Sequence, residues 1–137
     1  KDERIARLDW TKEQREELLG ETLPSLHLIC EGKVAGITLT AAQMRQAGAK
    51  AGHTDGLVDY AIDLEGVAMA YFARETEDGR VKVSLRALEP WRVDQVAERF
   101  GGGGHRLASG LTLDMPLAEV VRVVEGALTE ALGSVNA

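Results

Sequence analysis

The chain has 137 residues, a formal net charge of -6 at neutral pH, 45% hydrophobic residues and one cysteine. This length is typical of one compact domain, and the apolar content is enough for a core. The single thiol excludes an intrachain disulfide, and no apolar run approaches the roughly 20 residues of a membrane-spanning helix. The acidic balance disfavours sequence-independent binding to duplex nucleic acid.

The N-terminal segment, residues 1–24, predicts a helical linker. It mixes charged residues with scattered aliphatic ones, and Thr11 with Gln14 fits a capping box. The chain opens on Lys1 and is charged where a secretory signal would be apolar. We therefore expect a cytoplasmic protein without a membrane segment, of which this chain is a piece, with residues 25–137 forming the domain proper.

The rest of the chain predicts an α/β fold, a single domain with a mixed sheet of about five strands flanked by helices. The expected elements, in chain order, are a hairpin around residues 31–33, helices over 41–49 and 54–64, a hairpin around Asp78-Gly79, a helix over 93–100, a strand over 111–113 and an amphipathic helix from Pro116 to Gly133.

The second hairpin carries the first candidate site residues. Side chains alternate along a strand, so Lys82, Ser84 and Arg86 are expected on the face opposite Val83 and its apolar neighbours. An arginine on a rigid strand can hold a phosphate through two parallel hydrogen bonds. The stretch from residue 80 to 106 has six basic residues against three acidic ones, which favours a small anionic ligand. A solvated surface arginine is the alternative.

Four consecutive glycines at residues 101–104, followed by His105 and Arg106, are the most unusual feature. A backbone without Cβ atoms allows close approach, and successive N–H groups can converge on an anion. If residues 105–110 begin a helical turn, its N-terminus adds to that preference, with His105 and Arg106 as side-chain donors. Neither G-x-G-x-x-G nor a P-loop fits these positions. A flexible loop is the alternative.

No metal site and no catalytic residue is predicted within this chain. The three histidines are scattered, and His27, in an apolar strand, is expected to be structural. Only the run His53-Thr54-Asp55 places two possible metal ligands, a histidine and an aspartate, close together. Thr54 or Asp55 is explained more simply as the cap of the following helix. No serine, Ser109 included, lies in the G-x-S-x-G context of a nucleophile elbow.

Several motifs together resemble a known family: FGGGGHRLASG, VKVSLRA, TDGLVDYAIDLEGVAMAYFARE and the Asp-Gly hairpin. They resemble the C-terminal DHH-associated domain of DHH-family phosphoesterases, closest to the nanoRNase (oligoribonuclease) and pAp phosphatase subgroup, from about residue 26 onward. The resemblance implies an N-terminal catalytic domain that holds the DHH motif and two metal ions, usually manganese. No Asp-His-His occurs in this chain.

The resemblance also implies a function and a site. The domain would bind the phosphate or nucleotide end of a short oligoribonucleotide (nanoRNA) or of 3′-phosphoadenosine 5′-phosphate, and would hydrolyse nothing alone. The amides of Gly102, Gly103 and Gly104 with His105 would hold the terminal phosphate or a group close to the base of a short substrate. Arg86 would contact phosphate with Ser84 nearby, and Ala87 stands where the family often has serine.

Other assignments stay open at this point. The domain could belong to a RecJ-like single-strand exonuclease or to a cyclic dinucleotide phosphodiesterase, or it could be purely structural and mediate dimerisation. The expected partners are a short oligonucleotide or nucleotide substrate and the N-terminal DHH catalytic domain. A homodimer of the parent protein is left open.

Overall fold

The N-terminal part of the domain is a helix that leads into an edge strand. A computed structural model of the chain describes residues 12–48, 54 and 56–136. Helix α2 (Lys12–Thr22) is followed by a 3-10 turn, η1 (Leu23–Ser25), and by strand β1 (His27–Ile29). The predicted helix is therefore confirmed from residue 12. Its expected cap, Thr11, lies outside the described residues.

Six strands form one mixed sheet in the order β1-β2-β3-β4-β6-β5. The strands after β1 are β2 (Val34–Leu39), β3 (Met69–Glu75), β4 (Val81–Ala87), β5 (Gly103–His105) and β6 (Ala108–Leu113). Within this described sheet, β2 and β3 pair in parallel and the other neighbours are antiparallel. Both predicted hairpins and the mixed sheet are confirmed. The additional strand is β5, formed by the glycine-rich segment.

The helices lie close to their predicted positions, with one difference at the C-terminus. They are α3 (Ala41–Gln46), α4 (Leu57–Ile62), α5 (Asp94–Arg99) and α6 (Leu117–Asn136). A capping box between Thr40 and Gln43 begins α3. The predicted end of the last helix at Gly133 is wrong. Gly133 does not take the left-handed conformation with which a glycine ends a helix, so α6 continues to Asn136.

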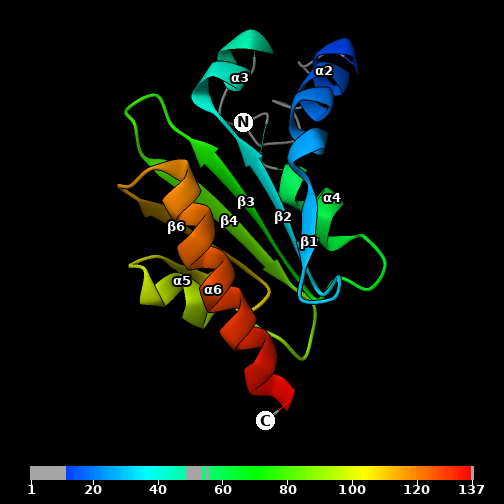
Figure 1. The fold of residues 1–137 in the computed structure, drawn as a ribbon, viewed down its shortest axis with the longest axis vertical. Helices are drawn as coiled ribbons and strands as arrows, with labels where there is room; N and C mark the ends of the chain where they lie inside the picture. Colours follow the sequence, from blue (N-terminus) through cyan, green and yellow to red (C-terminus); the bar gives the residue numbers. More distant parts are fainter. Residues whose placement is uncertain (1–11, 49–53, 55, 137) are drawn as a thin grey trace.

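The two faces of the sheet are covered to different extents. Helices α5 and α6 pack on one face, over side chains such as Val83 and Leu85, and α6 runs across the sheet in Figure 1. Helices α2, α3 and α4 form the second core with Ile37 and Phe72. Among the described residues, that second core contains none from β4, β5 or β6. On this second face α4 also contacts β4, and among the described helices none covers β5 and β6.

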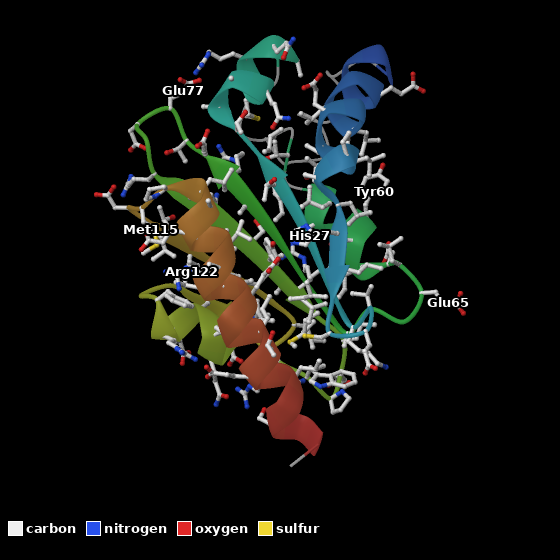
Figure 2. The ribbon with its side chains drawn as sticks, viewed as in Figure 1. His27, Tyr60, Glu65, Glu77, Met115 and Arg122 are labelled. Atoms are coloured by element: carbon white, nitrogen blue, oxygen red, sulfur yellow. The ribbon has the colours of Figure 1, made fainter. Side chains whose placement is uncertain are left out.

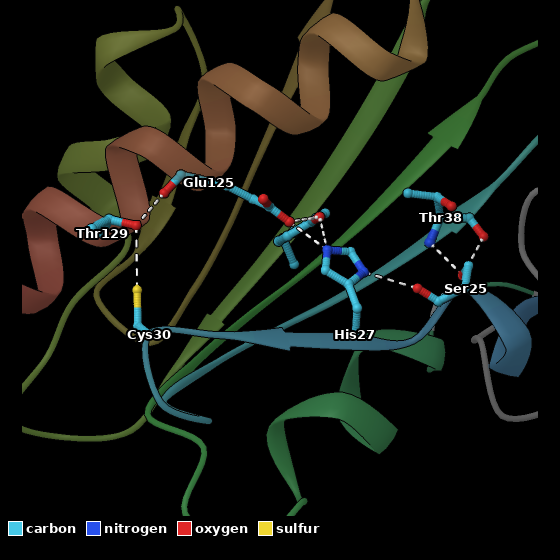
Figure 3. Close-up of polar contacts among 7 residues, drawn as sticks. Ser25, His27, Cys30, Thr38, Glu125 and Thr129 are labelled. Carbon is cyan, nitrogen blue, oxygen red and sulfur yellow. Dashed lines mark hydrogen bonds and ion pairs between the residues drawn. The ribbon is translucent and has the colours of Figure 1, made fainter.

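A polar cluster joins β1, β3 and α6. The Nε2 atom of His27 lies 2.5 Å from Oε2 of Glu125, and its Nδ1 atom lies 2.9 Å from the carbonyl oxygen of Ser25 (Figure 3). Tyr71 donates its hydroxyl hydrogen to the same Glu125 oxygen at 2.5 Å. Its ring lies against Gly36, where a Cβ would be 2.3 Å from the ring carbon Cζ. The predicted structural role of His27 is confirmed.

The partners of His27 favour its charged form. Both of its nitrogens face oxygen acceptors, so the doubly protonated imidazolium satisfies the cluster best. Burial alone would lower the pKa of His27. The hydrogen bonds to Ser25 and Glu125, with the charge of Glu125, outweigh burial and raise this pKa above its ordinary value of 6.5. Figure 2 shows His27 between β1 and α6, so the cluster fixes the edge strand to that helix.

The raised pKa of His27 predicts a pH dependence of stability. The contribution of the protonated histidine is fully present below about pH 6.5, the value in the unfolded chain, and is lost as pH rises through the higher folded-state pKa. We expect Glu125→Gln to lower the free energy of unfolding by about 1 kcal/mol at pH 6 and to flatten its decline toward pH 8. Urea unfolding at several pH values measures both effects.

Glu130→Gln is the matched control, because Glu130 lies on the same helix and pairs with the exposed Arg99. This variant should keep the full pH dependence of the parent chain. Equal pH profiles for Glu125→Gln and the parent would show that the His27–Glu125 contact does not titrate with folding.

Candidate functional site

The sheet register brings the predicted site residues onto one face. Paired residues on neighbouring strands share a face, and two rows cross the outer strands: Arg86, Ala108 and His105, and next to it Ser84, Gly110 and Gly103. Strands lie about 4.8 Å apart, so the backbones at Arg86 and His105 are about 10 Å apart. We call these six residues, with Lys82 and Thr112 in the adjoining row, the open face.

Several polar groups of the open face have no partner within the described part of the chain. The side chains of Lys82, Ser84, Thr112 and His105 form no hydrogen bond or ion pair with any described residue. Between them, Ala108, Gly110 and Gly103 keep the floor low. Unpaired donors around a shallow, small-residue floor can take an anionic ligand without first breaking contacts within the chain.

Arg86 is held in place from two sides. Its Nε atom donates to Oδ1 of Asp59 on α4 at 3.2 Å. Its Nη1 atom donates to the carbonyl oxygen of the preceding residue, Leu85, at 3.0 Å. The side chain is 27% exposed. A guanidinium has five N–H groups, so these contacts orient Arg86 and leave donors for a ligand. Sequence reasoning missed Asp59, because only the packing of α4 against β4 brings it to Arg86.

The glycines of residues 101–104 have different physical reasons. Gly101 takes a left-handed φ of 87° at the end of α5. A Cβ on Gly102 would lie 2.1 Å from the carbonyl oxygen of Gly110, and one on Gly104 would lie 2.7 Å from that of Ala108. A Cβ on Gly103 would meet nothing within 4 Å. The fold therefore requires glycine at positions 101, 102 and 104. Gly103 is not required in this way, and it leaves unfilled space on the open face.

The predicted helical turn after the glycines is wrong. Residues 103–105 and 108–113 form the antiparallel pair β5–β6 instead, because glycine lets the two backbones approach closely. The carbonyls of Arg106 and Leu107 accept hydrogen bonds from the amides of Val93 and Ala87 at 2.7 and 3.0 Å, which fixes the turn. The hairpin therefore offers a strand edge and not a helix N-terminus.

One of the predicted anion-binding amides is used within the chain. The N–H of Gly102 donates to the carbonyl of Ala97 at 2.8 Å, and that of Gly101 donates to Glu98 at 3.1 Å. These bonds tie the loop to the end of α5. Gly102 therefore shapes the loop, and the prediction of an anion contact rests on Gly103, Gly104 and His105.

The basic excess of the sequence is largely offset in the fold. Carboxylates from outside residues 80–106 pair with three of its arginines: Asp59 with Arg86, Asp78 with Arg80 and Glu130 with Arg99. Within the stretch, Arg92 makes two hydrogen bonds to Asp94, which lower the pKa of that carboxyl to about 2. The local basic excess is thus largely paired with carboxylates, and Lys82 is the cation of the open face without a described ion-pair partner.

Arg106, the remaining predicted donor, pairs with Glu89 at 3.0 Å. Both side chains are more than half exposed, and such pairs contribute only about 0–1 kcal/mol, so Arg106 can exchange this carboxylate for a ligand at little cost. A pocket lined by Asp94, Gly104, His105, Arg106 and Leu107 lies at this turn of the hairpin. It places Arg106 beside His105, at the border of the open face.

Metal ligands do not gather in the described residues. No group of three or more His, Cys, Asp or Glu side chains there could hold a metal ion. His53 and Asp55, the ligand-type pair of the sequence, lie outside that part of the chain. Among the described helices, none combines the length and the apolarity that crossing a membrane requires.

Comparison with protein families identifies a domain family that covers most of the chain. The sequence model of the DHHA1 domain matches residues 33–135. A curated relative, the bifunctional oligoribonuclease and PAP phosphatase NrnA of Thermus thermophilus, is 36% identical over 103 residues, which are 70% of this chain and 31% of that protein.

Two solved structures are similar in fold. An exopolyphosphatase-related protein from Bacteroides fragilis aligns with a TM-score of 0.81 at 28% identity, over 89% of this chain and 36% of the other. A pGpG-specific phosphodiesterase, PggH of Vibrio cholerae, aligns with a TM-score of 0.64 at 12% identity, over 89% of this chain and 40% of the other. The chain spans about a third of the length of the relatives that it matches.

The space around Gly102 and Gly103 predicts different effects of alanine at these neighbouring positions. We expect Gly102→Ala to lower the free energy of unfolding by about 2 kcal/mol or more, because its Cβ would meet the backbone of β6. Gly103→Ala should be neutral or stabilise the fold by up to about 0.5 kcal/mol, since alanine reduces the entropy of the unfolded chain. Urea unfolding of both variants and the parent measures this contrast, and equal effects would contradict the hairpin geometry.

Proposed function

This chain belongs to the DHHA1 domain family, and from that membership we propose that it is the substrate-binding domain of a phosphoesterase acting on short oligoribonucleotides, 3′-phosphoadenosine 5′-phosphate or both. The name of the Thermus relative supports this substrate class. The observation that carries the proposal is the open face, where Arg86, Ser84 and His105 surround a glycine floor without a helical cover.

The residues of the open face divide the binding between them. Arg86 presents its unused N–H groups to a phosphate, in the planar geometry that suits two phosphate oxygens. The Ser84 hydroxyl, in the next row, adds a donor beside it. His105 and the backbone at Gly103 and Gly104 hold the phosphate from the β5 side. Anchoring one end of a short substrate in this way positions the bond to be cleaved.

Hydrolysis itself is assigned to another domain of the parent protein. The chain spans about a third of its relatives, and its described residues include no group of three or more potential metal ligands. We place the two manganese ions in an N-terminal DHH domain that residues 1–24 would join to this one. The task of the present chain is then to bind and orient the substrate.

Two other assignments lead to different binding behaviour. The domain of a single-strand exonuclease should bind longer strands more tightly, with a strong dependence on salt. A purely structural domain should not bind nucleotides at all. Titration with adenosine 3′,5′-bisphosphate and with adenosine oligonucleotides of two to twelve residues separates these assignments from the proposed one.

Substitution of Arg86 and His105 tests the proposed site. We expect Arg86→Ala and His105→Ala each to weaken the binding of adenosine 3′,5′-bisphosphate about tenfold, because each removes hydrogen bonds to a charged phosphate. Arg86→Lys should recover only part of the affinity, since lysine cannot bind two phosphate oxygens side by side. Isothermal titration calorimetry of the 137-residue chain gives the dissociation constants.

Arg99→Ala is the matched control, because Arg99 also pairs with a carboxylate but lies on α5, on the other side of the sheet. It should bind as the parent does. Unchanged affinity in both Arg86→Ala and His105→Ala would contradict the proposed site.

A further inference from the structure

Leu88 is a large apolar side chain that is half exposed beside the proposed phosphate site. It directly follows β4 and is 50% exposed. Its amide donates to the carbonyl of Ala68 at 2.9 Å, which extends the β3–β4 pairing one step beyond Met69 and Ala87. The alternation that turns Ser84 and Arg86 outward therefore turns Leu88 toward the same side of the sheet.

The backbone of Leu88 is fixed on both sides of the residue. Besides the bond from its amide, its carbonyl accepts a hydrogen bond from the amide of Trp91 at 3.0 Å. The next residue, Glu89, is the carboxylate that pairs with Arg106. Along the chain Leu88 thus lies between Arg86 and Glu89, the partner of Arg106, and its backbone is held in a defined position. An ordered position lowers the entropic cost of using a side chain as a binding surface.

The spacing along β4 matches a ligand that carries both a phosphate and an apolar group. Two residues of a strand span about 6.7 Å, which separates Arg86 from Leu88 by roughly the length of one sugar unit. A purely inorganic anion gains nothing from an exposed leucine, whereas a flat nucleobase can cover it and remove apolar surface from water.

We propose that Leu88 is the surface on which the nucleobase of the substrate lies while Arg86 holds its phosphate. This inference rests on the proposed function and makes its substrate class narrower: a nucleotide with a base one sugar away from the anchored phosphate, in preference to inorganic polyphosphate or a sugar phosphate. Leu88 then determines specificity and affinity for the base, and takes no part in holding the phosphate.

Calorimetry with three probes tests this role: adenosine 3′,5′-bisphosphate, ribose 5-phosphate and pyrophosphate. We expect Leu88→Ala to weaken the binding of adenosine 3′,5′-bisphosphate about fivefold and to leave the affinities for the two probes without a base unchanged. Leu88→Phe should bind the adenosine ligand at least as tightly as the parent, because an aromatic ring stacks well on a base.

Leu28→Ala is the matched control, since Leu28 is 53% exposed on β1, at the opposite edge of the sheet. It should bind all three probes as the parent does. If Leu88→Ala binds adenosine 3′,5′-bisphosphate like the parent, or loses all three probes equally, the role of Leu88 is overturned while the proposed function stands. If the parent chain itself binds none of the probes, the proposed function fails as well.

Discussion

The parallel pairing of β2 with β3 requires a crossover connection, and the helices of that connection lie over the strands that it joins and, through α4, against the neighbouring strand β4. Helices α3 and α4 therefore pack, together with α2, over β2 and β3. The outer strands are connected by hairpins and by α5, and α5 packs on the opposite face. Because no described helix of the crossover covers β6 and β5, the outer part of this sheet face keeps its polar side chains accessible.

The glycine-rich segment gives this uncovered part of the sheet a shallow floor. β5 can lie close to β6 only because Gly102 and Gly104 have no Cβ, and this pairing brings Gly103 and His105 into the rows of Ser84 and Arg86. The glycines thus act first as packing residues. Their contribution to ligand binding depends on the low floor and on the position of His105, which a helical turn would have placed elsewhere.

The positive charges near the open face are mostly paired with carboxylates and do not form an excess of unpaired charge. All five arginines of residues 80–106 already face a carboxylate, so the surface is not a broad attractor for polyanions. Asp59 orients Arg86, while three of the guanidinium N–H groups form no hydrogen bond with a described residue. This arrangement favours one short ligand with a phosphate in a set position, and Leu88 adds an apolar surface next to it.

The sequence by itself determined both hairpins, the approximate helices, the outward direction of Lys82, Ser84 and Arg86, and the family. These features depend on local periodicity and on motifs, which neighbouring residues encode. The tertiary structure decided that residues 103–105 form a sixth strand, that Asp59 reaches Arg86, and that α6 passes through Gly133. Such features depend on which distant backbones and side chains meet, and a glycine run is compatible with a loop, a helical turn or a strand until its partner strand is known.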